Sequence, residues 1–185
     1  MSARTLEEAV DHMNKAVAAL SHEFAGVRTG RASGAILEKI TVEYYGVVTP
    51  LLQIASVSAP EPQMLVISPY DRTAMNAIEK AILASNLGLN PSNDGQVIRL
   101  PFPPLTEERR KELAKLCRHY AEESRVAVRN IRRDINDALK RQEKEGEISQ
   151  DDLRRLETDV QKATDTHIKD IDELLRRKEQ EIMEV

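Results

Sequence analysis

Residues 105–145 read LTEERRKELAKLCRHYAEESRVAVRNIRRDINDALKRQEKE, and this stretch contains neither Gly nor Pro. Those two residues weaken a helix most, so their absence predicts one continuous helix. About 40 helical residues would span roughly 60 Å. Thr106 lies where a residue that caps a helix N-terminus is expected, and Gly146 lies where the helix should end. The fold is therefore expected to be organised around one long helix.

Two other stretches also show the apolar spacing of helices. The chain before Gly30 begins with a possible capping box, Thr5 and Glu8. Its apolar residues then alternate at intervals of four and three, at Leu6, Val10, Met13, Val17, Leu20, Phe24 and Val27. Beyond Gly146, Ser149 and Asp152 fit a second cap before an amphipathic run to the C-terminus. We expect an elongated antiparallel three-helix bundle that buries the three apolar seams together.

The segment from 31 to 104 has a different period. Short runs rich in β-branched residues predict strands, namely alternating positions within 36–44, then 54–58, 64–68 and 97–100. Asp71 fits the N-cap of a helix that ends near Asn86 and Gly88, and residues 91–95 have the composition of a turn. The fold class is therefore α+β. We expect residues 1–30 and 105–185 to form the bundle, with residues 31–104 as an inserted α+β domain.

Two linkers would join the inserted domain to the bundle. The first is made permissive by its glycines and consists of Thr29, Gly30, Arg31, Ala32, Ser33 and Gly34. The second is proline-rich and semi-rigid and consists of Pro101, Phe102, Pro103 and Pro104. A double connection of this composition predicts a hinge with restricted freedom.

The charge of the chain is unevenly distributed. The net charge is −4, yet residues 109–133 hold nine Lys or Arg against three Glu, a local net charge of +6. At 100° per residue, the basic residues that fall within about 60° of Lys111 are Lys111, Lys115, Arg118, Arg125, Arg129, Arg132 and Arg133. We call these seven residues the basic row. The opposite, apolar side is expected to hold Leu113, Leu116, Tyr120, Ala127, Ile131 and Ile135.

The basic row has two interpretations. A solvated helix surface is the ordinary one, but such surfaces usually mix charges of opposite sign at neighbouring positions. Like charges at Arg125, Arg129 and Arg132 repel, and a phosphate backbone would offset that repulsion. Arginine also matches phosphate geometry. Because no aromatic residues are interleaved, a folded RNA or DNA surface fits better than stacked single strands.

Signals for other functions are weak. Gly26 and Gly30 share the glycine spacing of a phosphate-binding loop, but the Lys-Ser/Thr that completes it is absent. The four histidines are dispersed, which predicts no metal site, and Cys117 falls on the apolar side of its helix. No apolar run approaches the roughly 18 residues of a membrane span. We expect no cofactor and no enzymatic activity, leaving a coiled-coil adaptor as the main alternative to nucleic-acid binding.

Five strings in this order and spacing carry a family resemblance: RTGRAS at 28–33, VEYYG at 42–46, NLGLNP at 86–91, PPLTEERR at 103–110 and RVAVRNIRR at 125–133. With them, nearly the whole chain closely resembles the ribosome recycling factor family. One departure is Gly34, where many members of that family carry proline.

The resemblance implies a three-helix bundle and a β/α/β domain joined by a two-strand hinge. It also implies a function: with elongation factor G and GTP, to release ribosomes from messenger RNA after termination. The implied partners are large-subunit ribosomal RNA and elongation factor G, without DNA or membrane, for a monomer in the cytoplasm of a bacterium or, after processing, in an organelle. The RNA contacts implied are first Arg129 and Arg132, then Arg133, Arg125, Arg118, Arg110, Arg28 and Arg31.

Overall fold

The computed structural model of the protein describes residues 2–184. These residues divide into two compact units. The first, the bundle unit, comprises the chain up to Phe24 together with Lys115–Glu179. The second, the sheet unit, comprises Ala25–Ala114 and the chain from Gln180 on.

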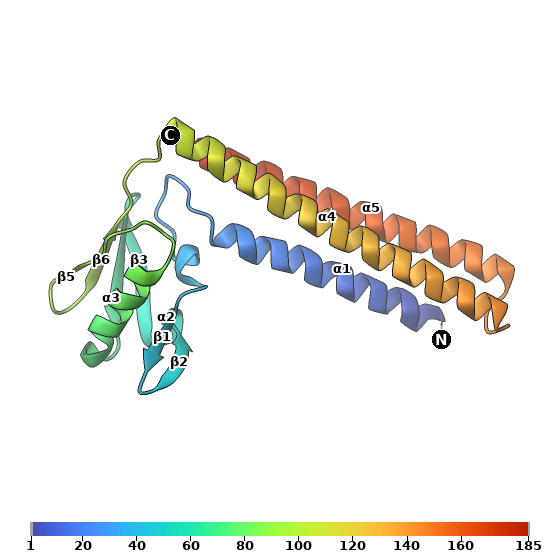
Figure 1. Ribbon diagram of the computed structural model, residues 1–185, viewed down its shortest axis with the longest axis horizontal. Coiled ribbons are helices and arrows are strands. Elements are labelled where there is room, and N and C mark those ends of the chain that lie inside the picture. Colours follow the sequence, from blue (N-terminus) through green and yellow to red (C-terminus); the bar gives the residue numbers. More distant parts are fainter. Residues whose placement is uncertain (1, 185) are drawn as a thin grey trace. The chain divides into compact units, whose positions relative to one another are not determined.

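Three long helices supply the bundle unit, and all three were predicted. They are α1 (Ser2–Ala25), α4 (Glu107–Lys144) and α5 (Gln150–Met183). Within the bundle unit α1 and α5 run in the same direction and α4 runs in the opposite one (Figure 1). The capping box predicted at Thr5 and Glu8 is wrong, because α1 already begins at Ser2 and Thr5 lies inside it.

The core of the bundle unit is mostly aliphatic, with a few polar side chains. Its buried apolar residues are Ala9, Met13, Leu20, Phe24, Cys117, Ala121, Val128, Leu139, Leu156, Val160 and Ile171. Ser124, Thr164 and His167 are buried beside them. The hydroxyl of Ser124 donates to the Ala16 carbonyl, and both ring nitrogens of His167 lie within 2.7 Å of an oxygen, on Ala163 and Asn14. These contacts satisfy polar groups that burial would otherwise destabilise.

A short turn connects α4 to α5. Gly146 follows α4 in the left-handed region at φ 75°, which glycine adopts without steric cost, and its N–H donates to the Glu143 carbonyl. The Ser149 hydroxyl accepts the N–H of Asp152 at 3.1 Å and donates to its carboxylate at 2.8 Å. The predicted cap at the start of α5 is therefore confirmed.

The sheet unit contains two antiparallel sheets. In the first, β1 (Thr41–Tyr44) pairs with β2 (Val47–Pro50). The second has the order β3-β4-β6-β5, formed by β3 (Ala55–Glu61), β4 (Met64–Pro69), β6 (Ile98–Pro101) and β5 (Ser92–Asn93). Four segments complete the unit: the one-turn helix α2 (Leu51–Ile54), the helix α3 (Met75–Ala84) and the 3-10 turns η1 (Gly34–Leu37) and η2 (Arg72–Ala74).

One apolar core holds the sheet unit together. It packs α3 residues against both sheets and η1, and its fully buried members are Leu37, Val42, Leu51, Leu65, Ile67, Ile78, Ile82, Ile98 and Leu100. The chain thus has the predicted α+β class, with long helices that pack together and a small antiparallel sheet domain. One local prediction is wrong, because Ile36 lies in η1 and not in a strand. The predicted turn at 91–95 is confirmed in part: two of its residues form β5, and Gly95, at φ 86°, donates its N–H to the Asn93 side chain in the turn that follows.

Asp71 links three parts of the sheet unit. Its carboxylate accepts hydrogen bonds from the N–H and hydroxyl of Thr73, at 2.9 and 2.7 Å. Asp71 is therefore a cap as predicted, but it caps the 3-10 turn η2 that precedes α3, whose own N-cap position is Ala74. The Asp71 carboxylate also accepts the hydroxyls of Tyr44 and Tyr45, at 2.9 and 3.1 Å. Tyr45 has a positive φ of 48°, unusual for a side chain of this size, and forms the β1–β2 turn with Gly46. The hydroxyl bonds of Tyr44 and Tyr45 to Asp71 hold that turn against the start of η2, and the two tyrosine rings contact each other.

Candidate nucleic-acid interface

The basic row lies on the flank of α4, not directly opposite the core. The residues of α4 that are buried within the bundle unit are Cys117, Ala121, Ser124, Val128 and Leu139. Leu116, expected on the apolar side, is 38% exposed. Because the buried face is rotated toward the basic row, Arg125 and Arg132 are half-buried while Arg129 and Arg133 are exposed. The expectation that the whole basic side faces away from the core is therefore wrong.

Three arginines of the row, spaced seven residues apart, contact α5. Arg118 forms an ion pair with Glu179. Arg125 donates from Nε and Nη2 to the Oδ1 atom of Asp172, at 2.9 and 2.7 Å. Arg132 donates from Nη1 to the amide oxygen of Gln161 at 3.1 Å. A spacing of seven keeps the same side of α4 turned toward its neighbour, which explains why these three reach α5.

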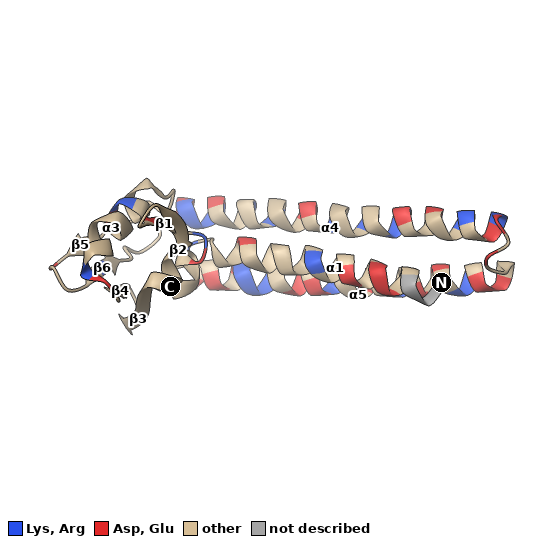
Figure 2. Ribbon diagram, turned by 90° about the horizontal axis from the view of Figure 1, so that it is seen from below, with Lys and Arg blue, Asp and Glu red and all other residues tan. Residues whose placement is uncertain are grey.

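Glu122 neutralises part of the row from within α4. Its Oε2 atom accepts Nη1 of Arg125 at 2.9 Å, and its Oε1 atom accepts Nη1 of Arg129 at 3.2 Å. The hydrogen bond from Arg125, followed by that from Arg129, lowers the pKa of Glu122 below its usual value. The carboxylate therefore remains ionised near neutral pH. Figure 2 shows this interleaving of acidic and basic residues along α4 and α5.

At the C-terminal end of the row the positive charge is only weakly neutralised. Arg132 has an amide as its partner, and Gln161 in turn donates to Asp165 at 2.9 Å. The guanidinium of Arg133, 69% exposed, has its nearest carboxylate, on Asp134, at 3.9 Å. An amide oxygen orients a guanidinium without cancelling its charge. The end of the row thus combines oriented side chains with unneutralised charge, which suits a phosphate ligand.

The other predicted RNA contacts belong to the sheet unit. Arg28 donates from Nη2 to the Pro103 carbonyl, and its guanidinium lies 5.8 Å from the centre of the Phe102 ring. Burial, and then the charge of Arg109, lowers the pKa of Arg28. Nε of Arg28 and Nε of Arg110 are buried, and neither donates a hydrogen bond to any of the described residues. Arg31 is exposed. The structure thus gives Arg28 a packing role between the two predicted linkers.

Both linkers are also bonded to the turn between β3 and β4. The N–H of Ala32 donates to the Pro62 carbonyl at 2.7 Å, and that of Phe102 to the Gln63 carbonyl at 2.8 Å. Phe102 is 2% exposed. Gly34 lies close to the sheet, since a Cβ atom there would be 3.4 Å from Val57. Ala32 and Phe102 are therefore fixed to the sheet, although the sequence offered no sign of these backbone bonds.

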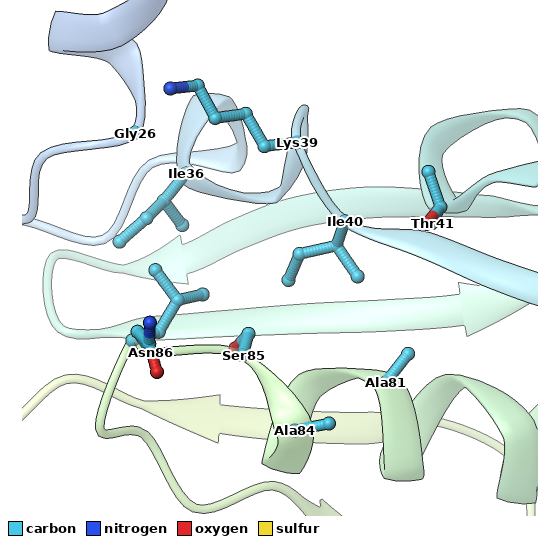
Figure 3. A pocket seen from close by; sticks show the side chains of 10 residues that line it. Gly26, Ile36, Lys39, Ile40, Thr41, Ala81, Ala84, Ser85 and Asn86 are labelled. Atoms are coloured by element: carbon cyan, nitrogen blue, oxygen red, sulfur yellow. The ribbon is translucent and has the colours of Figure 1, made fainter.

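A cavity of about 400 Å³ lies in the sheet unit beside the end of α3 (Figure 3). Its walls carry both apolar and polar side chains, from Gly26, Ile36, Lys39, Ile40, Thr41, Ala81, Ala84, Ser85, Asn86 and Leu87. Lys39 is the only ionisable side chain among these lining residues, so the cavity has no acid–base pair. Across residues 2–184, His, Cys, Asp and Glu form no group able to hold a metal ion. No helix in the same range is long and apolar enough to cross a membrane.

Comparison with known proteins connects this arrangement to one family. The family described as "Ribosome recycling factor" matches residues 20–183. The chain is 58% identical to the ribosome-recycling factor of Geobacillus kaustophilus (strain HTA426) and 57% identical to that of Bacillus licheniformis. Both comparisons extend over 185 residues and cover 100% of each protein.

Two solved structures resemble the fold over all of this chain. A solution structure of the ribosome recycling factor has 45% sequence identity and a TM-score of 0.81, with 98% of that protein covered. The second is the T. thermophilus ribosome recycling factor, described together with E. coli elongation factor G bound to the E. coli post-termination complex. It has 50% identity and a TM-score of 0.70, with 100% of that protein covered. Identity at this level along the full length shows that the chain belongs to the ribosome recycling factor family.

Proposed function

We propose that this protein, together with elongation factor G and GTP, takes apart the ribosomal complex left on messenger RNA after termination. Membership of the family supports this function. So does the related T. thermophilus factor, which is described with elongation factor G on a post-termination complex. The protein would catalyse no reaction itself and would contribute binding energy and movement, while GTP hydrolysis would belong to its partner.

The observation that carries the proposal is the C-terminal end of the basic row, where, among the described residues, Arg132 contacts only an amide, Arg133 is exposed and Arg129 is paired with Glu122 alone. Arg129, Arg132 and Arg133 would bind phosphates of large-subunit ribosomal RNA, because their guanidinium groups combine charge with several N–H donors. Arg129 is 47% exposed, so it can be reached without unfolding α4. Arg118 and Arg125 would contribute mainly to the field around this site, since their donors already contact carboxylates of α5.

The two linkers would act as the hinge through which the partner's force reaches the bundle. In this proposal residues 31–104 form the moving domain, and residues 1–30 with 105–185 form the RNA-binding domain. Ala32 and Phe102 are fixed to the β3–β4 turn. The rotation would therefore fall on Thr29, Gly30 and Arg31 in the first linker and on Pro103 and Pro104 in the second. Arg28, Arg31 and Arg110 would add contacts to RNA only near this hinge.

The proposed setting is the cytoplasm, where ribosomes work, and the proposed state is a monomer without a cofactor. Its partners would be the large ribosomal subunit and elongation factor G, with no role for DNA. A coiled-coil adaptor would explain the three long helices but not the inserted sheet domain.

The test replaces both principal contacts, as Arg129→Glu with Arg132→Glu. We expect affinity for large ribosomal subunits to fall by about 100-fold, because two charge-assisted contacts are lost. Splitting of post-termination ribosomes by elongation factor G and GTP should fall with it, while far-UV circular dichroism stays unchanged. Wild-type affinity should also weaken steadily as salt rises, through release of counterions.

A matched control is Arg141→Glu with Lys144→Glu, which makes the same change in net charge near the end of α4. This control should bind within about threefold of the wild type if local contacts matter more than total charge. Equal losses in the two double variants would refute the assignment of the anchor. The assignment would also be refuted if the protein bound a protein partner after nuclease treatment and showed no affinity for ribosomal subunits.

A further inference from the structure

Glu122 occupies an unusual place in the basic row. It is the carboxylate that contacts two arginines of the row at once, Arg125 through Oε2 and Arg129 through Oε1. Its side chain is 54% exposed. The acidic neighbour Glu123 is equally charged but contacts His119 instead, at 3.3 Å. The two adjacent carboxylates therefore differ in whether they touch the proposed RNA-binding arginines.

The contact with Glu122 is not needed to hold Arg125 in place. Arg125 already donates twice to Asp172 and is mostly buried, with 19% of its side chain exposed. Arg129 has no such second carboxylate partner among the described residues, and Glu122 reaches it at the longer distance of 3.2 Å. Exposed ion pairs of this kind add little to stability, because water screens them and the side chains lose freedom.

Nη1 of Arg129, which donates to Glu122, is one of the guanidinium nitrogens that a phosphate would use. A guanidinium N–H that donates to a carboxylate oxygen cannot donate fully to a phosphate oxygen at the same time. A carboxylate and a phosphate beside one another also repel. A phosphate that binds Arg129 must therefore displace Glu122 or share the guanidinium with it at a cost in binding free energy.

We propose that Glu122 is an internal competitor of the RNA phosphate at Arg129. It holds the arginine while the site is empty, has to release it when RNA binds, and so limits affinity and speeds departure of the protein. This role suits a factor that must leave the ribosome after each round, and it rests on the function proposed above. Arg132 differs, because its neutral partner Gln161 orients it without competing for charge.

The experiment compares Glu122→Gln with Glu123→Gln in the full-length protein. Both variants remove one negative charge at neighbouring positions of α4, but only the first removes the carboxylate that contacts Arg129. Equilibrium and dissociation kinetics with purified large ribosomal subunits should show E122Q binding roughly 2- to 5-fold more tightly than E123Q, the range expected for one exposed ion pair. E122Q should also dissociate more slowly. Equal or weaker binding by E122Q would overturn the proposal.

A second pair of variants locates the effect. In an Arg129→Gln background, adding E122Q should no longer improve binding over adding E123Q, because the arginine for which Glu122 and the phosphate compete is absent. A gain that persists in this background contradicts the proposal. The variant Arg129→Glu with Arg132→Glu belongs in the same assay: wild-type affinity there would refute the proposed anchor. If this double variant loses affinity while E122Q and E123Q bind equally well, only the proposed role of Glu122 is refuted.

Discussion

Nε and Nη2 of Arg125 on α4 donate to the same carboxylate oxygen of Asp172 on α5, at 2.9 and 2.7 Å. Burial by itself lowers the pKa of Arg125, but the hydrogen bonds to Asp172 and Glu122 outweigh that effect and the pKa is raised. The ion pair between Arg125 and Asp172 therefore joins α4 to α5. The charge of the Arg125 guanidinium is almost fully balanced by carboxylates of the protein. We therefore expect Arg125 to contribute mainly to the stability of the bundle.

Replacing Arg125 should accordingly affect stability more than binding. We expect Arg125→Met to lower the free energy of unfolding by about 1–2 kcal/mol, because the Asp172 carboxylate loses its charged donor. Arg129→Met should leave stability within about 0.5 kcal/mol of the wild type but weaken binding to large ribosomal subunits more than Arg125→Met does. Urea denaturation and a subunit-binding assay on both variants measure the two effects. A larger loss of affinity in Arg125→Met would show that Arg125 is itself an RNA contact.

Arg28 should control how firmly the two linkers are held together. Its contacts with the Pro103 carbonyl and the Phe102 ring join segments 75 residues apart in the chain. Arg28→Gln shortens the side chain and removes the cation, so amide hydrogen exchange in residues 27–34 and 101–105 should become faster. Arg31→Gln, an exposed arginine three residues on, is the control and should leave those rates near wild type. Unchanged exchange in Arg28→Gln would mean that the backbone bonds to the β3–β4 turn suffice.

Asp71 should make stability depend on pH below about 4. The hydrogen bonds from Thr73, followed by that from Tyr44, lower the pKa of Asp71 to about 2. Because the folded-state pKa lies below that of the unfolded chain, about 3.9, the stabilisation is complete above pH 4 and is lost as pH falls toward 2. Asp71→Asn should remove this contribution.

Urea unfolding of wild type and Asp71→Asn between pH 2 and pH 6 tests the role of Asp71. The difference in unfolding free energy between the two proteins should shrink as pH falls. A constant difference across the range would show that the Thr73 and Tyr44 contacts do not depend on the charge of Asp71.

The three helices and the strands β3, β4 and β6 could be predicted because their signals are local. Residues 105–145 lack Gly and Pro, and Asp71 and Ser149 stand where caps are required. The hydropathy of the residues alone did not predict correctly which side of α4 is buried. Hydropathy favours Leu116 over Ala121 and Ser124, whereas closely packed helices bury small side chains at their contacts. Ile36 was misread because its 3-10 turn depends on the Ser33 hydroxyl, which accepts the N–H of Ala35.

The basic row was visible in the sequence, but its neutralisation was not. Asp172 and Gln161 lie on a different helix from Arg125 and Arg132, and the register between two helices is set by packing along their whole length. Glu122 was within reach of a sequence argument, since it precedes Arg125 by three residues and Arg129 by seven. Like charges in a row predict an external anion, whereas acidic residues of the protein already offset part of the repulsion.

The contact between Arg28 and Pro103 also bears on how the bundle forms. The turn at 145–149 connects α4 to α5, but α1 is separated from α4 by residues 26–106. Closing an unstructured loop of that length costs about 2–3 kcal/mol more entropy than closing the short turn. Once the sheet unit has folded, Arg28 and Pro103 touch, so the long segment starts and ends at nearly one point. The inserted residues then act as a short connection, and a mutation that unfolds the sheet should also weaken the hold of α1 on its partner helices.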